Sequence, residues 1–192
     1  YRDSSGYSMP HNPEALEVIY NLRSNNSISS NHLEMYVQDT WRLETSNSIF
    51  SLNYGLRMSH WSWNKEWLFS PRASLTYIPK NHDNMTIRLA TGLYYQRPFY
   101  KELRDTITNG ATTIVQLNKD IQSQRSFQVI AGYEYRFKLG KRPFLFSTEL
   151  YYKAQDRLNP YTIDNTKIVY YGRNCATGNV MGIDLKLYGE FV

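Results

Sequence analysis

The sequence is poor in cysteine and has no long hydrophobic run. Cys175 is the only cysteine among 192 residues, which excludes an internal disulfide, a redox pair and a cysteine-based zinc site. No apolar stretch approaches the ~20 residues that a membrane-spanning helix requires, so a helical membrane protein is excluded. A membrane protein built from strands stays open, because each strand exposes only alternate residues to lipid. We also expect no signal peptide, since the chain opens without a basic segment followed by an apolar one.

Patterns for catalysis and metal binding are missing as well. The four histidines (His11, His32, His60 and His82) are far apart, and none stands in an H-E-x-x-H pattern. There is no nucleophile elbow and no glycine-rich phosphate loop. We therefore predict no catalytic residue, no metal site, no cofactor and no enzymatic activity. The net charge is +5, but basic and acidic residues alternate along the chain, so no nucleic-acid partner is predicted.

What the sequence does contain is alternation of apolar and polar residues. In residues 85–96 one set of alternate positions is mostly apolar, and the set between them is mostly polar or small. Side chains alternate across a strand, so this segment predicts a strand with one oily and one wet face. Seven segments show the pattern and are predicted as strands: 33–43, 48–59, 71–79, 85–96, 125–137, 143–154 and 180–191. They are about as long as the ~9–11 residues that cross a bilayer at a tilt.

The segments between these strands are of two kinds. Residues 44–47, 80–84 and 138–142 are short and rich in turn formers or charge. Residues 60–70, 97–124 and 155–179 are long, and residues 1–32 look like a fourth long external loop. Short and long connections alternate strictly, as periplasmic turns and extracellular loops do in transmembrane barrels. We predict an all-β fold: a single partial barrel domain, with an antiparallel up-and-down meander of about seven strands.

Several strand sequences resemble those of TonB-dependent outer-membrane receptors, in the Tyr-rich style of the Bacteroidetes branch. The run Tyr36-Val-Gln-Asp-Thr-Trp-Arg-Leu43 resembles a "YxQD-W-L" strand, and Ser70-Pro-Arg-Ala-Ser-Leu-Thr-Tyr77 resembles an "SPR-SLxY" strand. Thr91-Gly-Leu-Tyr-Tyr-Gln-Arg-Pro98 looks like the "G-YYQ-P" strand of the same barrels. Later strands, such as Gly182-Ile-Asp-Leu-Lys-Leu-Tyr188, match in order. The resemblance covers residues 30–192, and the order of the motifs is more specific than any one of them.

The resemblance implies a C-terminal part of a larger barrel in the outer membrane. Family members look like 22-stranded barrels with an N-terminal plug and a TonB-contacting segment, and this sequence shows neither. The partners implied are outer-membrane lipid, the plug domain and TonB of the parent protein. The whole protein would import a scarce solute such as a metal chelate, a vitamin or a glycan. Studied alone, the chain is expected to self-associate through its strand edges.

Two groups of residues are candidates for contact with the solute. The segment Arg97-Pro-Phe-Tyr-Lys-Glu-Leu-Arg104 is dense in aromatic and charged residues, so Arg97, Phe99, Tyr100 and Arg104 are candidate external-loop ligand contacts. In that segment Pro98 could simply end a strand, and Leu103 could pin the loop to the barrel. The candidate lumen-lining residues are Arg57, Arg72, Arg88, Glu134, Arg136, Glu149 and Asp184. These charged side chains could equally pair with one another or with a plug.

Two alternative functions stay open at the level of sequence. One is a soluble, lipocalin-like β protein that binds a small ligand with its apolar face inward. The other is a passive porin or adhesin barrel. Detergent dependence distinguishes the first from a membrane barrel, and a plug domain encoded upstream would exclude the second.

Overall fold

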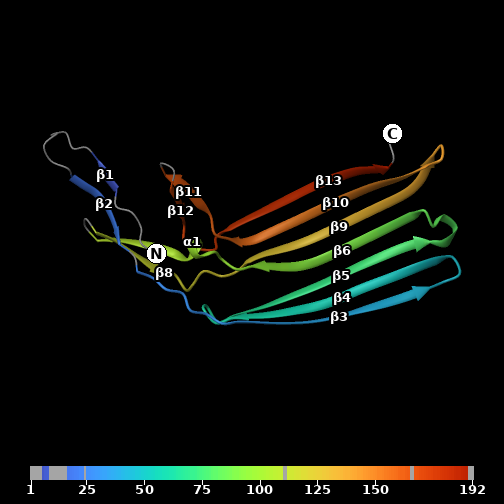
Figure 1. The fold of residues 1–192 in the computed structure, drawn as a ribbon. Coiled ribbons are helices and arrows are strands. Elements are labelled where there is room, and N and C mark those ends of the chain that lie inside the picture. Colours follow the sequence, from blue (N-terminus) through green and yellow to red (C-terminus); the bar gives the residue numbers. More distant parts are fainter. Residues whose placement is uncertain (1–5, 9–16, 24, 110–111, 165–166, 190–192) are drawn as a thin grey trace.

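A seven-stranded antiparallel sheet dominates the computed structural model, which describes all residues except 1–5, 9–16, 24, 110–111, 165–166 and 190–192 (Figure 1). Its order is β13-β10-β9-β6-β5-β4-β3, so strands that follow one another along the chain lie side by side. The predicted antiparallel up-and-down fold is therefore confirmed. The strands are β3 (His32–Glu44), β4 (Ser48–Trp61), β5 (Glu66–Pro79), β6 (Met85–Gln96), β9 (Gln124–Leu139), β10 (Arg142–Leu158) and β13 (Ala176–Gly189).

Each of the seven ranges expected from sequence falls on one of these strands. The expected and observed ranges agree because the expectation rests on alternation. A strand keeps its apolar residues on the same face along its whole length. The range expected at 180–191 ends outside the described residues. Observed strands are longer than expected at several ends. One example is β10, which continues to Leu158.

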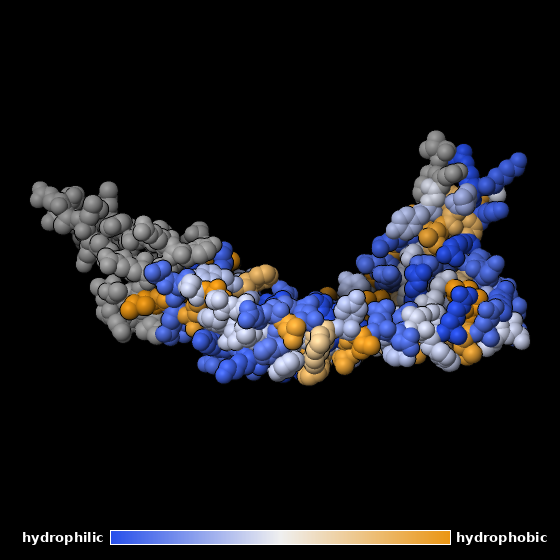
Figure 2. Space-filling view, turned by 60° about the horizontal axis from the view of Figure 1, so that its bottom comes forward, coloured by the Kyte–Doolittle hydropathy of each residue, from blue (hydrophilic) through white to orange (hydrophobic). Residues whose placement is uncertain are grey.

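The pairing register places most of the oily residues on one side of the sheet. One row crosses it through Trp41, Leu52, Leu75, Leu89, Ala131, Leu150 and Ile183. We call this side the apolar face and the opposite side the polar face. The apolar face is uncovered within the described residues: Leu89, Leu150 and Ile183 are 50%, 55% and 59% exposed. Apolar side chains are accordingly visible at the outer surface of the trough-shaped molecule (Figure 2).

Shorter elements gather at one end of the sheet, and the connections β3–β4, β5–β6 and β9–β10 lie at the other end (Figure 1). A second sheet has the order β1-β2-β8-β7, from β1 (Gly6–Ser8), β2 (Glu17–Arg23), β7 (Arg104–Asn109) and β8 (Thr112–Leu117). A small hairpin joins β11 (Tyr161–Asp164) and β12 (Lys167–Tyr170), and the short helix α1 spans Tyr100–Leu103. At the opposite end a single 3-10 turn, η1 (Lys80–His82), joins β5 to β6. Among the described residues no helix is long and apolar enough to cross a membrane.

The long connection predicted at 60–70 is wrong. Strands β4 and β5 continue toward each other and leave only residues 62–65 as a turn, in which Lys65 has a φ of +56°. The alternation was hidden because a single apolar residue, the buried Leu68, lies on the polar face between Trp67 and Phe69. Long and short connections therefore do not alternate strictly.

That residues 1–32 form an external loop stays a prediction, although the range also contains strands. The described part of this range contains β1 and β2, which belong to the second sheet, and the first residue of β3. In that sheet β2 pairs with β8 in parallel at three positions. Residues 1–5, 9–16 and 24 of this range lie outside the described residues.

The buried core is small and sits at the loop end of the sheet. Trp61, Leu103 and Ile121 form it, and Ile28, Trp63 and Leu117 pack against them. Leu103 is 1% exposed, so α1 is pinned to the end of β4, as the sequence suggested for this leucine. The packed interior therefore anchors the segments at the loop end, while the described residues place no second layer over either face along the rest of the seven-stranded sheet.

Candidate functional site

A groove of about 640 Å³ lies on the polar face, over β3, β4, β5 and β6. Its polar lining includes Gln38, Asn53, Arg72, Ser74 and Tyr94. These side chains share one face because they occupy the positions between the oily residues of their strands. The groove offers hydrogen-bond donors, acceptors and an aromatic ring.

Small residues make room for long ones in this groove. Arg72 pairs across the sheet with Gly92, and its guanidinium lies 4.5 Å from the centre of the Tyr94 ring. A Cβ at Gly92 would lie 3.0 Å from the Tyr94 ring and 3.2 Å from Cγ of Arg72. A larger residue at position 92 would therefore require the Tyr94 ring or the Arg72 side chain to shift by a few tenths of an ångström.

The structure brings several predicted lumen-lining residues together as ion pairs. Arg88 contacts Glu134 at 2.7 Å, and Arg136 lies 3.8 Å from the other oxygen of the same carboxylate. Arg57 pairs with Glu34 on the neighbouring strand. All seven predicted residues lie on the polar face, and the cross-strand partners Glu149 and Asp184 stand side by side there. Whether they contact a solute stays a prediction.

The four predicted loop contacts surround α1. Arg97 and Phe99 are exposed, and Phe99 (63% exposed) is the N-cap residue of the helix. Tyr100 and Arg104 are partly buried, and each already has an interaction within the chain. Only Arg97 and Phe99 therefore present most of their surface to solvent. Ligand contact by these residues stays a prediction.

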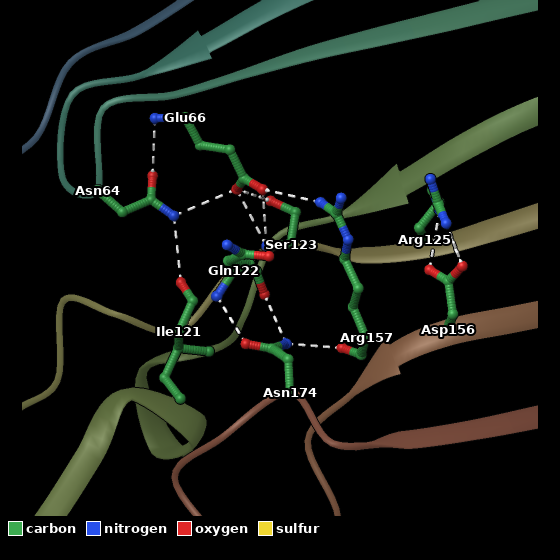
Figure 3. A network of polar contacts seen from close by, with 9 residues as sticks. All are labelled: Asn64, Glu66, Ile121, Gln122, Ser123, Arg125, Asp156, Arg157 and Asn174. Atoms are coloured by element: carbon green, nitrogen blue, oxygen red, sulfur yellow. Dashed lines mark hydrogen bonds and ion pairs between the residues drawn. The ribbon is translucent and has the colours of Figure 1, made fainter.

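The sequence did not reveal a polar clamp at the rim of the polar face (Figure 3). We define the clamp as Asn64, Glu66, Gln122, Ser123, Arg157 and Asn174. The carboxylate of Glu66 accepts hydrogen bonds from the Ser123 hydroxyl at 2.7 Å and from the Ser123 backbone N–H at 3.0 Å. Asn64 donates to Glu66 at 3.2 Å and to the backbone oxygen of Ile121 at 3.1 Å. Ser123 is fully buried, so these bonds satisfy donors that water cannot reach.

Asn174 extends the clamp to the connection between β12 and β13. Its side-chain oxygen accepts from the Gln122 backbone N–H at 2.8 Å, and its amide donates to the Gln122 carbonyl at 2.9 Å. The same amide donates to the Arg157 carbonyl at 2.6 Å. Arg157 has a φ of +56°, beside a register shift between β10 and β13. Strained backbone at a bulge persists when its surroundings hold it, and Asn174 supplies that contact.

Only a weak signal in the sequence could have revealed the clamp. Asn64 and Asn174 are turn-forming residues in segments assigned to loops, and such residues more often bond to their own neighbours. Their actual partners lie 57 and 52 positions away, at Ile121 and Gln122.

Beneath the loops, α1 carries a buried carboxyl group. Glu102 is 6% exposed, and burial raises the pKa of its carboxyl, although hydrogen bonds from the Phe99 backbone and from Gln124 act in the opposite direction. Its Oε2 atom has no hydrogen-bond partner. The Asn159 amide donates to the backbone oxygen of Glu102 at 3.3 Å. Burial, together with the charge of Glu102, also raises the pKa of the Tyr170 hydroxyl.

Within the described ranges, no three His, Cys, Asp or Glu side chains come together as metal ligands. His32 is 3.0 Å from Glu34, which already pairs with Arg57. The chemistry available on the polar face is therefore hydrogen bonding, charge and aromatic contact.

Comparison with known proteins gives one match over the whole chain. A family model described as "TonB dependent receptor-like, beta-barrel" matches residues 1–192. No curated protein and no solved structure matched the chain.

Proposed function

The chain belongs to the TonB dependent receptor-like β-barrel family, and from this premise we propose that it forms wall, lumen surface and external loops of an importer. The family consists of outer-membrane receptors and transporters and is not a family of enzymes. In the proposal, the apolar face meets lipid and the polar face lines the lumen. The solute would be scarce, such as a metal chelate, a vitamin or a glycan, and a plug domain and TonB would supply gating and energy.

The observation that carries the proposal is the height of the apolar face. On β9, every alternate residue from Phe127 to Phe137 is apolar or aromatic, and Arg125 stands above this run. Ten residue steps at ~3.3 Å make about 33 Å of strand. At the ~40° tilt of barrel strands this covers about 25 Å, the height of the apolar band in outer-membrane barrels.

Aromatic rings lie along the edge of the apolar band that is farther from the loops. Phe137 and Phe144 have ring centres 5.6 Å apart, and Phe50 and Tyr77 have centres 5.0 Å apart, all near the tight-turn end. Toward the loop end, His60 and Trp67 are 4.5 Å apart. Aromatic girdles at both interfaces are typical of membrane barrels.

The lipocalin-like alternative has less support. It needs the oily residues to enclose a cavity, whereas Leu89, Leu150 and Ile183 at the centre of the apolar face are at least half exposed. A passive porin shares the wall architecture, so uptake that depends on TonB is the property that separates it from the proposed importer.

Paired spin labels test the orientation of the wall. Leu89→Cys and Ala90→Cys place a nitroxide on the apolar and the polar face of β6, in a Cys175→Ser background of the full-length protein in liposomes. We expect the label at 89 to be broadened by oxygen, which concentrates in lipid, and the label at 90 to be protected from oxygen. The same accessibility at both positions would contradict the proposal.

A further inference from the structure

A second hollow, of about 500 Å³, opens on the apolar face near its loop end. It spans β6, β9, β10 and β13. The side chains that matter for its chemistry are Leu93, Arg125, Phe127, Tyr152, Asp156 and Asn179. The register places Arg125 opposite Asp156, with Phe127 and Ala154 as the next pair toward the centre of the sheet. The hollow therefore lies where the apolar band of β9 ends.

The part of the hollow nearer the loops is polar but carries no net charge. Nε of Arg125 donates to both oxygens of Asp156 at 2.9 Å, so the cation is neutralised by a forked ion pair. The side chains of Arg125 and Asp156 are 38% and 35% exposed, so the pair still faces the hollow. Asn179 belongs to the same lining and adds an amide. Such a set donates and accepts hydrogen bonds without attracting either sign of charge.

The part of the hollow nearer the centre of the sheet is apolar and continues into the apolar band. Phe127 and Tyr152 are 45% and 40% exposed, and on the next positions Val129 and Met181 are 39% and 75% exposed. Tyr152 pairs with both Val129 and Met181 across the sheet. A molecule bound in the hollow would contact polar groups at the end nearer the loops and a continuous apolar surface toward the centre of the sheet. An amphiphile, with a polar head and an apolar tail, matches this arrangement.

We propose that this hollow binds the uncharged sugar headgroup of an outer-leaflet glycolipid. Sugar hydroxyls donate to Asp156 and accept from Arg125 and Asn179, while the C–H faces of the sugar rest on the rings of Phe127 and Tyr152. The acyl chains follow Val129 and Met181. A phosphate headgroup fits less well, because Asp156 already neutralises the guanidinium and would repel the anion. The inference rests on the proposed function, since it requires the apolar face to meet lipid.

Lipid retention tests the inference on the full-length receptor. The protein is placed in phosphatidylethanolamine nanodiscs with digalactosyldiacylglycerol, and retained lipid is counted by native mass spectrometry. We expect the double variant Arg125→Leu/Asp156→Leu to bind this glycolipid about tenfold more weakly, because the headgroup loses its charged hydrogen-bond partners. The double variant Glu44→Leu/Lys80→Leu removes an exposed ion pair of 2.8 Å at the opposite rim, and it should bind like the wild type.

Three results would overturn the inference. The first is equal glycolipid retention by the wild type and the Arg125→Leu/Asp156→Leu variant. The second is retention of phosphatidylglycerol as strong as that of the glycolipid, which would mean a phosphate site. The third is binding of soluble digalactose as tight as that of the lipid, which would mean a free-sugar site.

Membrane insertion is measured in parallel, by liposome flotation and by heat-modifiable migration on gels. A wild-type protein that fails to insert contradicts the proposed function itself. A protein that inserts but retains no glycolipid contradicts only the headgroup site. If the double variant fails to insert, Asn179→Ala takes its place, with weaker glycolipid retention expected for the same reason.

Discussion

At the scale of single residues, Glu66 has the largest structural role of the carboxylates at the loop end. Its side chain is 13% exposed and accepts three kinds of donor, from Ser123 and from Asn64. Glu44 is a useful contrast, because its carboxylate is 55% exposed and pairs with the exposed Lys80. Burial, and not the presence of an ion pair, decides which of the two matters for stability.

Glu66→Ala should loosen the external loops. The variant leaves the buried Ser123 N–H and hydroxyl without an acceptor, which costs about 1–3 kcal/mol. Hydrogen exchange measured by mass spectrometry should show faster exchange in residues 118–124. Glu44→Ala is the matched control, and it should leave exchange in residues 118–124 unchanged, because its ion pair with Lys80 is exposed. Unchanged exchange in the Glu66 variant would show that the clamp does not hold this segment.

The carboxyl of Glu102 should make the packing of α1 depend on pH. Because burial raises its pKa above the ordinary 4.5, the folded state holds the proton more tightly than the unfolded state. Stability is therefore full below pH 4.5 and is lost as pH rises from there through the raised pKa. Exchange protection of residues 100–104 should decrease over that rise. Glu102→Gln stays uncharged, so its protection should not change with pH. A pH-dependent loss of the same size in this variant would assign the effect to another group.

At the scale of elements, register is what makes the seven strands one surface. Each strand alone has one apolar and one polar face. The row from Trp41 to Ile183 forms because every pair of neighbouring strands places apolar residues opposite apolar residues. Pro71 shows how such a sheet accommodates an exception. It lacks a backbone N–H, and it stands just outside the β5–β6 pairing, which begins at Arg72.

Insertion of one residue should distinguish strand from turn. An alanine inserted between Leu89 and Ala90 exchanges the two faces for half of β6 and turns oily residues toward the lumen. We expect the full-length protein to lose heat-modifiable migration and to disappear from the outer membrane. The same insertion between Gly140 and Lys141, in the turn between β9 and β10, should be tolerated, because no pairing is shifted there. Equal tolerance of both insertions would contradict the register.

At the scale of the whole molecule, the sheet is open. Among the described residues, β3 and β13 each have a neighbour on one side only, so two rows of backbone groups face outward. The apolar face is also far larger than the patches that soluble monomers expose. In a complete barrel, further strands and lipid would cover both features.

The 192-residue chain in detergent-free buffer should therefore self-associate. Exposed strand edges pair with other chains, and apolar faces bury one another. Sedimentation velocity should show species larger than a monomer, and a detergent micelle should shift them toward smaller ones. A stable monomer in water would contradict this expectation, because it would mean that the chain covers its own edges and oily face.

The sequence by itself determined the strands, their two faces and the family resemblance. These follow from alternation, a local property that depends only on neighbouring residues. The tertiary structure decided the rest. The short turn at 62–65 was hidden because Leu68, on the polar face of β5, interrupts the alternation beside the turn. The clamp of Glu66, Ser123 and Asn174 and the hollow at Arg125 join strands and loops far apart in the chain. Such contacts depend on register and sheet curvature, which a pattern of alternating residues does not specify.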